Sequence, residues 1–150
     1  MTAIELSSQA FGDQDTVPVR HTGEGDDVSP PLTWSGVPDG TAELVLLCED
    51  PDAPGQTFLH WLVTGVSPRT TGVEEGRTPE GGKEWPNGFG RTGWSGPMPP
   101  PGHGTHRYFF RLWALSEPLA LSGRPSADDV HRAVEGKELA AGTLMGTYER

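Results

Sequence analysis

A chain of 150 residues with a formal net charge of −10 can bury a substantial core as one domain, and its charge disfavours nucleic acid and anionic membrane surfaces as partners. The 21 glycines and 15 prolines are typical of many turns between short strands. Cys48 is the only cysteine, which excludes an internal disulfide, and the sequence has neither a signal-peptide pattern nor an apolar run of about 18 residues. We therefore expect a soluble, cytoplasmic protein without stable insertion into a membrane.

The first third of the chain predicts short strands separated by loops. Residues 4–11 alternate between polar and apolar side chains, as a strand does. Residues 17–21 could add a second strand, which Pro18 would confine to a sheet edge because proline lacks an N–H donor. Residues 23–28 are acidic and contain glycine, which predicts a loop. Residues 29–34 (SPPLTW) are interpreted as a rigid extended connector.

Three hydrophobic runs predict the main strands, over residues 43–50, 58–66 and 105–115. The first two runs are apolar on both sides of the strand, which indicates that both faces of the sheet are covered. Side chains alternate along a strand, so each run has one predicted face. The residues expected to share these faces are Leu44, Leu46, Cys48 and Asp50 in the first run, Phe58, His60 and Leu62 in the second, and His106, Tyr108, Phe110 and Leu112 in the third.

The rest of the chain predicts one long loop, one helix and a final strand. Residues 67–91 lack periodicity, and loops of this length in compact domains are often functional. A capping box that begins at Ser126 predicts a helix over residues 127–135, and residues 139–148 are interpreted as a terminal strand. Together these elements predict a single domain over residues 1–150. Its expected fold is mainly β, an antiparallel Greek-key β-sandwich with one or two short C-terminal helices.

Two carboxylates stand in a proline-rich turn directly after the first main strand. Asp50 and Asp52 flank Pro51 in the motif DPDAP. An Asx-type turn, in which both carboxylates accept from backbone amides, is enough to explain this motif. Beside an imidazole such as that of His60, a carboxylate would also favour the charged ring and fix its orientation.

Two histidines and a tyrosine lie at the starts of the second and third main strands. His106 and Tyr108 share one face, and they converge with His60 and Asp50 if the third strand lies near the second. A lone strand histidine is usually a core or surface residue, but two imidazoles and a phenol together can hydrogen-bond a phosphate or a carboxylate. The sequence therefore predicts one small anion pocket. The proline-rich residues 97–102 are expected to form a rigid wall at its mouth, with a polyproline II ligand for a partner module as the alternative.

Other chemistries fit this sequence less well. His103 and His106 lie in a glycine-rich loop without the usual zinc spacing or a cysteine partner. No nucleophile elbow of the form G-x-S-x-G occurs, and no glycine motif for a nucleotide is present. Cys48 lies in mid-strand among apolar neighbours, where a thiol is normally inert. We therefore expect no catalytic residue, no metal ligand and no cofactor.

The motifs DPDAP, HW and GPMPPPG followed by HRY resemble the phosphatidylethanolamine-binding protein family, in its bacterial Raf-kinase-inhibitor-like branch. The resemblance covers nearly the whole chain, including SPPLTWSGVPDGT, NGFGRTGW and the ending GTYER. It implies an antiparallel β-sandwich with a C-terminal helical element and a pocket for phosphate-like anions. The residues that it implies at this pocket are Asp50, Asp52, His60, His106 and Tyr108, with Pro99 and Pro100 on its wall.

Three functions are compatible with these features. The leading one is a non-catalytic protein that binds a small anionic ligand, such as phosphate, phosphoethanolamine or a carboxylate, in order to sense or sequester it. The resemblance also suggests an inhibitor that contacts a kinase or a protease. The paired acidic and imidazole groups could instead serve a cyclase or an isomerase by proton transfer. The sequence leaves open whether the protein binds a protein partner and whether it forms a homodimer.

Overall fold

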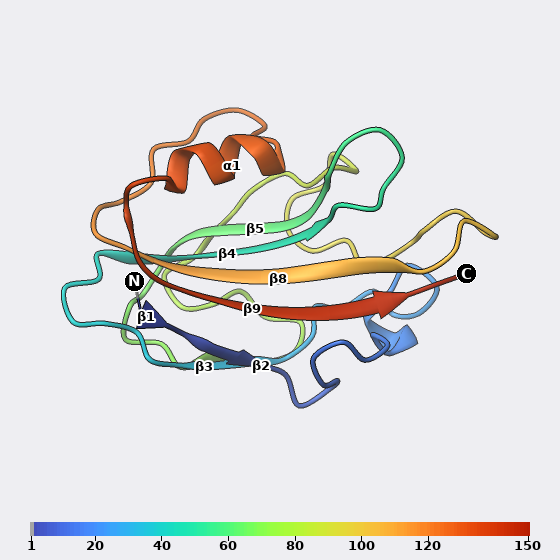
Figure 1. Cartoon of the computed structure of the whole chain (residues 1–150), viewed down its shortest axis with the longest axis horizontal. Helices are drawn as coiled ribbons and strands as arrows, with labels where there is room; N and C mark the ends of the chain where they lie inside the picture. Colours follow the sequence, from blue (N-terminus) through green and yellow to red (C-terminus); the bar gives the residue numbers. More distant parts are fainter. Residues whose placement is uncertain (1) are drawn as a thin grey trace.

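The computed structural model describes residues 2–150, which form two β-sheets and one α-helix (Figure 1). One sheet has six strands in the order β1-β9-β8-β4-β5-β7, and the other has three in the order β2-β3-β6. All neighbouring strands are antiparallel except β1 and β9. The elements are β1 (Thr2–Ala3), β2 (Glu5–Ser7), the 3-10 turn η1 (Val19–His21), β3 (Leu32–Ser35), β4 (Glu43–Asp50), β5 (Phe58–Val66), β6 (Gly72–Val73), β7 (Lys83–Glu84), β8 (His106–Leu115), α1 (Ala127–Val134) and β9 (Glu138–Tyr148).

The large sheet lies between α1 and the small sheet, so both of its faces are covered (Figure 1). Every residue of β4 is buried. Its even-numbered residues, such as Leu46, pack toward the small sheet, and its odd-numbered residues, such as Leu47, pack toward α1. The prediction of a mainly β, antiparallel sandwich with a short C-terminal helix is confirmed. None of the helices in residues 2–150 is long and apolar enough to cross a membrane.

The ends of α1 and β9 agree with the sequence patterns. Ser126 accepts a hydrogen bond from the backbone of Asp129, and the Asp129 carboxylate accepts one from the backbone of Ser126, which completes the predicted capping box. β9 runs along β8 over almost its full length. Residues 2–150 therefore contain one α-helix and a terminal strand where the sequence predicted them.

Two predictions for the first third of the chain were wrong. Residues 17–21, predicted as an edge strand, contain η1 instead. Pro18 precedes this turn with φ −59° and ψ 144°, and only the Val17 N–H still pairs with β9. Residues 29–34, interpreted as a connector, include most of β3, which is the centre of the small sheet. Its alternation of buried and exposed side chains over four residues is too short to distinguish a strand from an extended linker.

A β-bulge in β5 corrects the predicted face of that strand. Cys48 of β4 pairs with Trp61, but Glu49 pairs with Leu59, so His60 is an extra residue in the ladder. Leu62 consequently packs toward α1, whereas Phe58 and His60 lie on the opposite face. The expectation that Phe58, His60 and Leu62 share one face was therefore wrong for Leu62.

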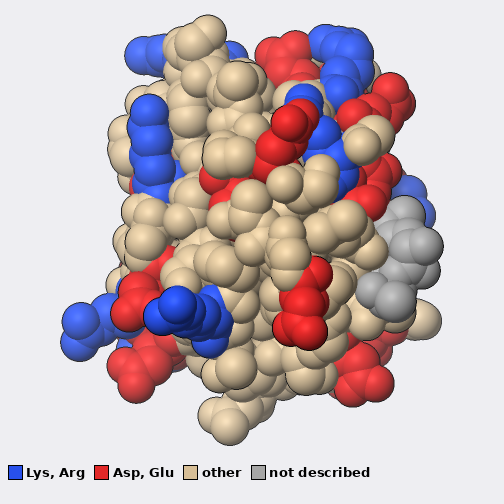
Figure 2. Space-filling view, turned by 90° about the vertical axis from the view of Figure 1, so that its left-hand side faces the viewer, with Lys and Arg blue, Asp and Glu red and all other residues tan. Residues whose placement is uncertain are grey.

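Charged side chains of both signs are intermixed on the surface that Figure 2 shows, which is the left-hand side of Figure 1. The net charge of −10 is not gathered into one acidic patch on this face. The opposite, right-hand end of Figure 1 carries the β4–β5 loop, the loop before β8 and the C-terminus.

Candidate functional site

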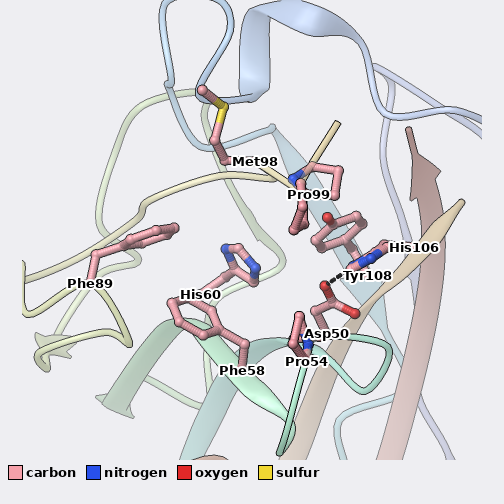
Figure 3. A pocket seen from close by; sticks show the side chains of 11 residues that line it. Asp50, Pro54, Phe58, His60, Phe89, Met98, Pro99, His106 and Tyr108 are labelled. Atoms are coloured by element: carbon pink, nitrogen blue, oxygen red, sulfur yellow. Dashed lines mark hydrogen bonds and ion pairs between the residues drawn. The ribbon is translucent and has the colours of Figure 1, made fainter. Parts of the chain in front are cut away.

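A cavity of about 150 Å³ lies where the end of β4 meets the beginnings of β5 and β8. Because these strands are antiparallel neighbours, their ends fall at one edge of the large sheet. The volume is below the roughly 300 Å³ of pockets for drug-sized ligands, so a small chemical group fits. The lining residues are Asp50, Ala53, Pro54, Phe58, His60, Phe89, Met98, Pro99, Pro100, His106 and Tyr108 (Figure 3).

Asp50 and His106 form a buried pair at the base of this cavity. The His106 Nδ1 atom lies 2.6 Å from the Asp50 Oδ2 atom, and both side chains are almost fully buried. A carboxylate can only accept, so Nδ1 carries the proton and donates it. The other carboxylate oxygen of Asp50 accepts the backbone N–H of Asp52 at 2.7 Å. Both oxygens of Asp50 are thus engaged, and the His106 ring is fixed in its orientation.

The β-bulge brings His60 into the cavity as a hydrogen-bond acceptor. Its Nδ1 atom lies 2.7 Å from the backbone oxygen of Ser95, which can only accept, so Nδ1 carries the proton. Burial lowers the pKa of His60, against the opposing effects of the Ser95 carbonyl and the charge of Asp50. The ring is therefore neutral near pH 7. Its Nε2 atom has a free lone pair at the cavity.

Tyr108 supplies a hydroxyl donor next to His60. The two rings meet edge to face, with centroids 5.2 Å apart. Burial, and after it the negative charge of Asp50, raises the pKa of Tyr108 well above its usual value, so the phenol stays protonated. No hydrogen bond contributes to this pKa shift, and none of those found within residues 2–150 uses the Tyr108 hydroxyl. It can donate to a group bound in the cavity.

His103 contacts His106, a residue of the cavity. The sequence alone suggests His103 only as a metal ligand, and its spacing does not favour that role. Its Nδ1 atom lies 2.6 Å from the Nε2 atom of His106. Both ring nitrogens of His106 are therefore occupied, one by Asp50 and one by His103. In residues 2–150, no group of three or more His, Cys, Asp or Glu side chains is arranged to hold a metal ion. The H-x-x-H spacing is explained here by an imidazole pair.

Asp52, a predicted pocket residue, does not line the cavity. Its carboxylate accepts from the backbone N–H and from the guanidinium of Arg107, at 2.9 Å in each case. Hydrogen bonds from Arg107 lower the pKa of Asp52 against the opposing effect of burial. Arg107 points away from the cavity because it alternates with His106 and Tyr108 along β8. Asp52 thus ties the β4–β5 turn to β8 and faces the outside of the site.

The wall and mouth of the cavity are apolar. Pro99 and Pro100 line it as predicted, and the Pro99 carbonyl accepts a hydrogen bond from Arg150 at 2.6 Å. Phe89 and Met98 are 47% and 39% exposed, which places two large apolar side chains at the opening. Sequence reasoning missed Phe89, because it lies in the long aperiodic loop and gives no periodic signal.

The family model described as phosphatidylethanolamine-binding protein matches residues 7–149. The chain belongs to this family. Among its relatives is the UPF0098 protein of Methanothermobacter thermautotrophicus, which is 43% identical over 98% of this chain and 99% of that protein. The family assignment agrees with the DPDAP, HW and HRY motifs, whose acidic, imidazole and phenol groups meet at the cavity.

Solved structures share the fold of this family member. E. coli YbcL, described as a member of the mammalian PEBP family, has a TM-score of 0.90 and is 29% identical over 99% of both chains. A carboxypeptidase Y inhibitor, solved in complex with its cognate proteinase, has a TM-score of 0.58 over 98% of this chain and 82% of that chain. At 16% identity the inhibitor supports the fold alone.

Proposed function

We propose that this protein binds a small phosphate-bearing headgroup in the cavity bounded by β4, β5 and β8. One observation carries the proposal: within residues 2–150 the Tyr108 hydroxyl and the His60 Nε2 atom have no hydrogen-bond partner, and both side chains line the same cavity beside the Asp50–His106 pair. Such a site suits a ligand that both accepts and donates hydrogen bonds. Family membership supports the same class of ligand.

The charges around the cavity favour a singly charged phosphate. None of the lining residues in the described part of the chain is Lys or Arg, and Asp50 places a buried carboxylate at the base of the cavity. A phosphate with two negative charges would be desolvated next to that carboxylate without a fixed cation to offset the cost. A phosphate that keeps one proton carries less charge, and its O–H can donate to the Nε2 atom of His60. Its other oxygens can accept from Tyr108.

The apolar mouth suits a phosphate that is attached to an organic group. Phe58 and Phe89 meet at a centroid distance of 4.7 Å along one side of the cavity, and Met98 lies at its opening. A small substituent such as ethanolamine would leave the cavity along these side chains. We therefore expect phosphoethanolamine to bind more tightly than inorganic phosphate, and acetate to bind most weakly because it has no proton for His60.

Calorimetric titration with phosphoethanolamine, phosphate and acetate tests the proposal. Tyr108→Phe removes one hydroxyl, and we expect about fivefold to tenfold weaker binding of phosphoethanolamine, as for the loss of one hydrogen bond in a buried site. Tyr148→Phe is the matched control, because the Tyr148 hydroxyl donates to Glu24 and does not line the cavity. Equal affinities of the wild type and Tyr108→Phe would refute the proposed site, as would the absence of binding to the wild type.

A further inference from the structure

His106 borders the cavity but offers it no free ring nitrogen. Its Nδ1–H is held by Asp50, and its Nε2 atom is held by His103, both at 2.6 Å. The ring centroids of His103 and His106 are 4.8 Å apart, with an interplanar angle of 57°. One ring donates its single N–H to the other, so the contact uses the only remaining hydrogen-bonding position of His106.

His103 is an exposed residue between two glycines in the loop that precedes β8. Gly102 and Gly104 flank it with φ values of +75° and +89°, and a Cβ at either position would meet no atom within 4 Å. Two backbone hydrogen bonds hold this loop, from the His103 N–H to the Pro100 carbonyl and from the Gly102 N–H to the Arg150 carbonyl, so release of His106 needs only a rotation of the His103 side chain. Because His103 is exposed and its hydrogen bond with His106 is only partly buried, water can replace that contact.

The contact leaves the cavity short of donors for an anion. With Nδ1–H held by Asp50, a protonated His106 has one further donor, Nε2–H, and His103 covers it. Neutral His60 presents an acceptor. Among the histidine and tyrosine side chains that line the cavity in residues 2–150, the Tyr108 hydroxyl is therefore the remaining donor. A ligand that takes a hydrogen bond from His106 must first displace His103.

We propose that His103 is a gating residue, whose imidazole caps His106 in the free protein and leaves it when the phosphate of a ligand binds. The proposal rests on the proposed function, because the ligand that displaces His103 is the one assigned to the cavity. His103 is thus a competitor of the ligand. It acts through His106 and makes no contact with the bound phosphate.

Titration of His103→Ala with phosphoethanolamine tests the gate. Removal of one competing hydrogen bond should tighten binding about twofold to tenfold. His103→Asn, which keeps an amide near the position of the Nδ1 atom, should bind close to the wild-type affinity. Thr105→Ala is the control from the same loop, because the Thr105 hydroxyl donates to Glu149 on the surface. Binding by His103→Ala that is unchanged or weaker would overturn the gate.

Imidazole ¹⁵N spectra provide a readout that a purely structural role would not affect. In the free protein, His103→Ala should shift the Nε2 resonance of His106. Saturation of the wild type with phosphoethanolamine should move the His103 resonances to those of a solvent-exposed imidazole, and unmoved resonances would overturn the gate. Binding that depends on Tyr108 but not on His103 refutes only the gate, whereas binding that does not depend on Tyr108 refutes the proposed function and the gate with it.

Discussion

The His106 Nδ1 atom lies 2.6 Å from the Asp50 Oδ2 atom, although 56 residues separate the two side chains along the chain. The antiparallel pairing of β4 with β8 brings them together, since the last residue of β4 meets the first residue of β8 at one edge of the sheet. The pair combines two roles. It satisfies a carboxylate that would be costly to bury alone, and it fixes a ring at the cavity.

The first prediction compares the two aspartates of the DPDAP turn. Asp50→Ala leaves the buried His106 Nδ1–H and the Asp52 N–H without their acceptor, so the free energy of unfolding should fall by about 1–3 kcal/mol. Asp52→Ala should cost clearly less, because its ion pair with Arg107 is exposed to solvent and screened. Urea denaturation of both variants measures the difference. An equal or larger loss for Asp52→Ala would contradict this assignment.

The second prediction concerns acid stability and Glu49, which faces α1. Burial by itself would raise the pKa of Glu49, but hydrogen bonds from His131 and Arg111, together with their charges, hold it below the ordinary value. The folded protein therefore binds fewer protons here than the unfolded chain does. This contribution to stability is complete above the unfolded pKa and is lost as pH falls through the lower, folded pKa.

Glu49→Gln tests that contribution directly. At pH 7 the free energy of unfolding of the variant should be about 1–3 kcal/mol lower than that of the wild type, because the variant loses hydrogen bonds made by a charged group. The difference should shrink as the pH is lowered below the usual pKa of a glutamate, about 4.3. Denaturation curves between pH 7 and pH 3 measure it. A difference that stays constant over this range would show that the charge of Glu49 does not stabilise the fold.

The third prediction is that His60 titrates below an ordinary histidine. Burial lowers its pKa, so the unfolded chain takes up a proton at a pH where the folded ring does not. The contribution of His60 to the free energy of unfolding is complete above about pH 6.5, which is the pKa of a histidine in the unfolded chain. This contribution decreases as the pH falls from there toward the folded pKa. Titration of the His60 ring by NMR, followed from pH 8 to pH 5, gives the folded value. A midpoint at or above 6.5 would contradict the neutral, acceptor form of His60.

The fourth prediction separates phosphate from sulfate. A phosphate ester has its second pKa near 6, so it carries a proton for His60 at pH 6, whereas a sulfate ester of the same alcohol does not. Phosphoethanolamine should therefore bind about fivefold or more tightly than ethanolamine sulfate at pH 6, because sulfate leaves the His60 Nε2 atom unpaired. The ratio should fall toward pH 8. Calorimetry at both values tests this, and a preference for sulfate would exclude the proposed role of His60.

Much of the site follows from strand patterns that can be read in the sequence. Residues 43–50, 58–66 and 105–115 have strong hydrophobic periodicity, and antiparallel neighbours bring their ends together. Asp50, His60, His106 and Tyr108 therefore converge in the structure as the sequence predicted. Whether they bind an anion is a proposal that the experiments above address.

Other parts of the site depend on local geometry that the sequence does not encode as a pattern. The alternation along β8 directs Arg107 outward, and the turn then brings Asp52 to it and away from the cavity. His103 reaches His106 through a glycine-flanked loop, whose course no periodicity describes. The bulge in β5 likewise cannot be recognised from the composition of the strand, because one added residue leaves its apolar character unchanged.

That bulge makes the site sensitive to the length of β5 as well as to its side chains. Substitution of His60 keeps the backbone irregularity and leaves a cavity with one wall altered. Deletion of His60 would instead let Leu59 and Trp61 follow each other in regular alternation against β4. Within this family, we therefore expect a one-residue insertion or deletion between the bulge and the β4–β5 turn to reverse the two faces of β5 there. Side chains that face the cavity would turn toward α1, and those that face α1 would turn toward the cavity, even if no other residue changed.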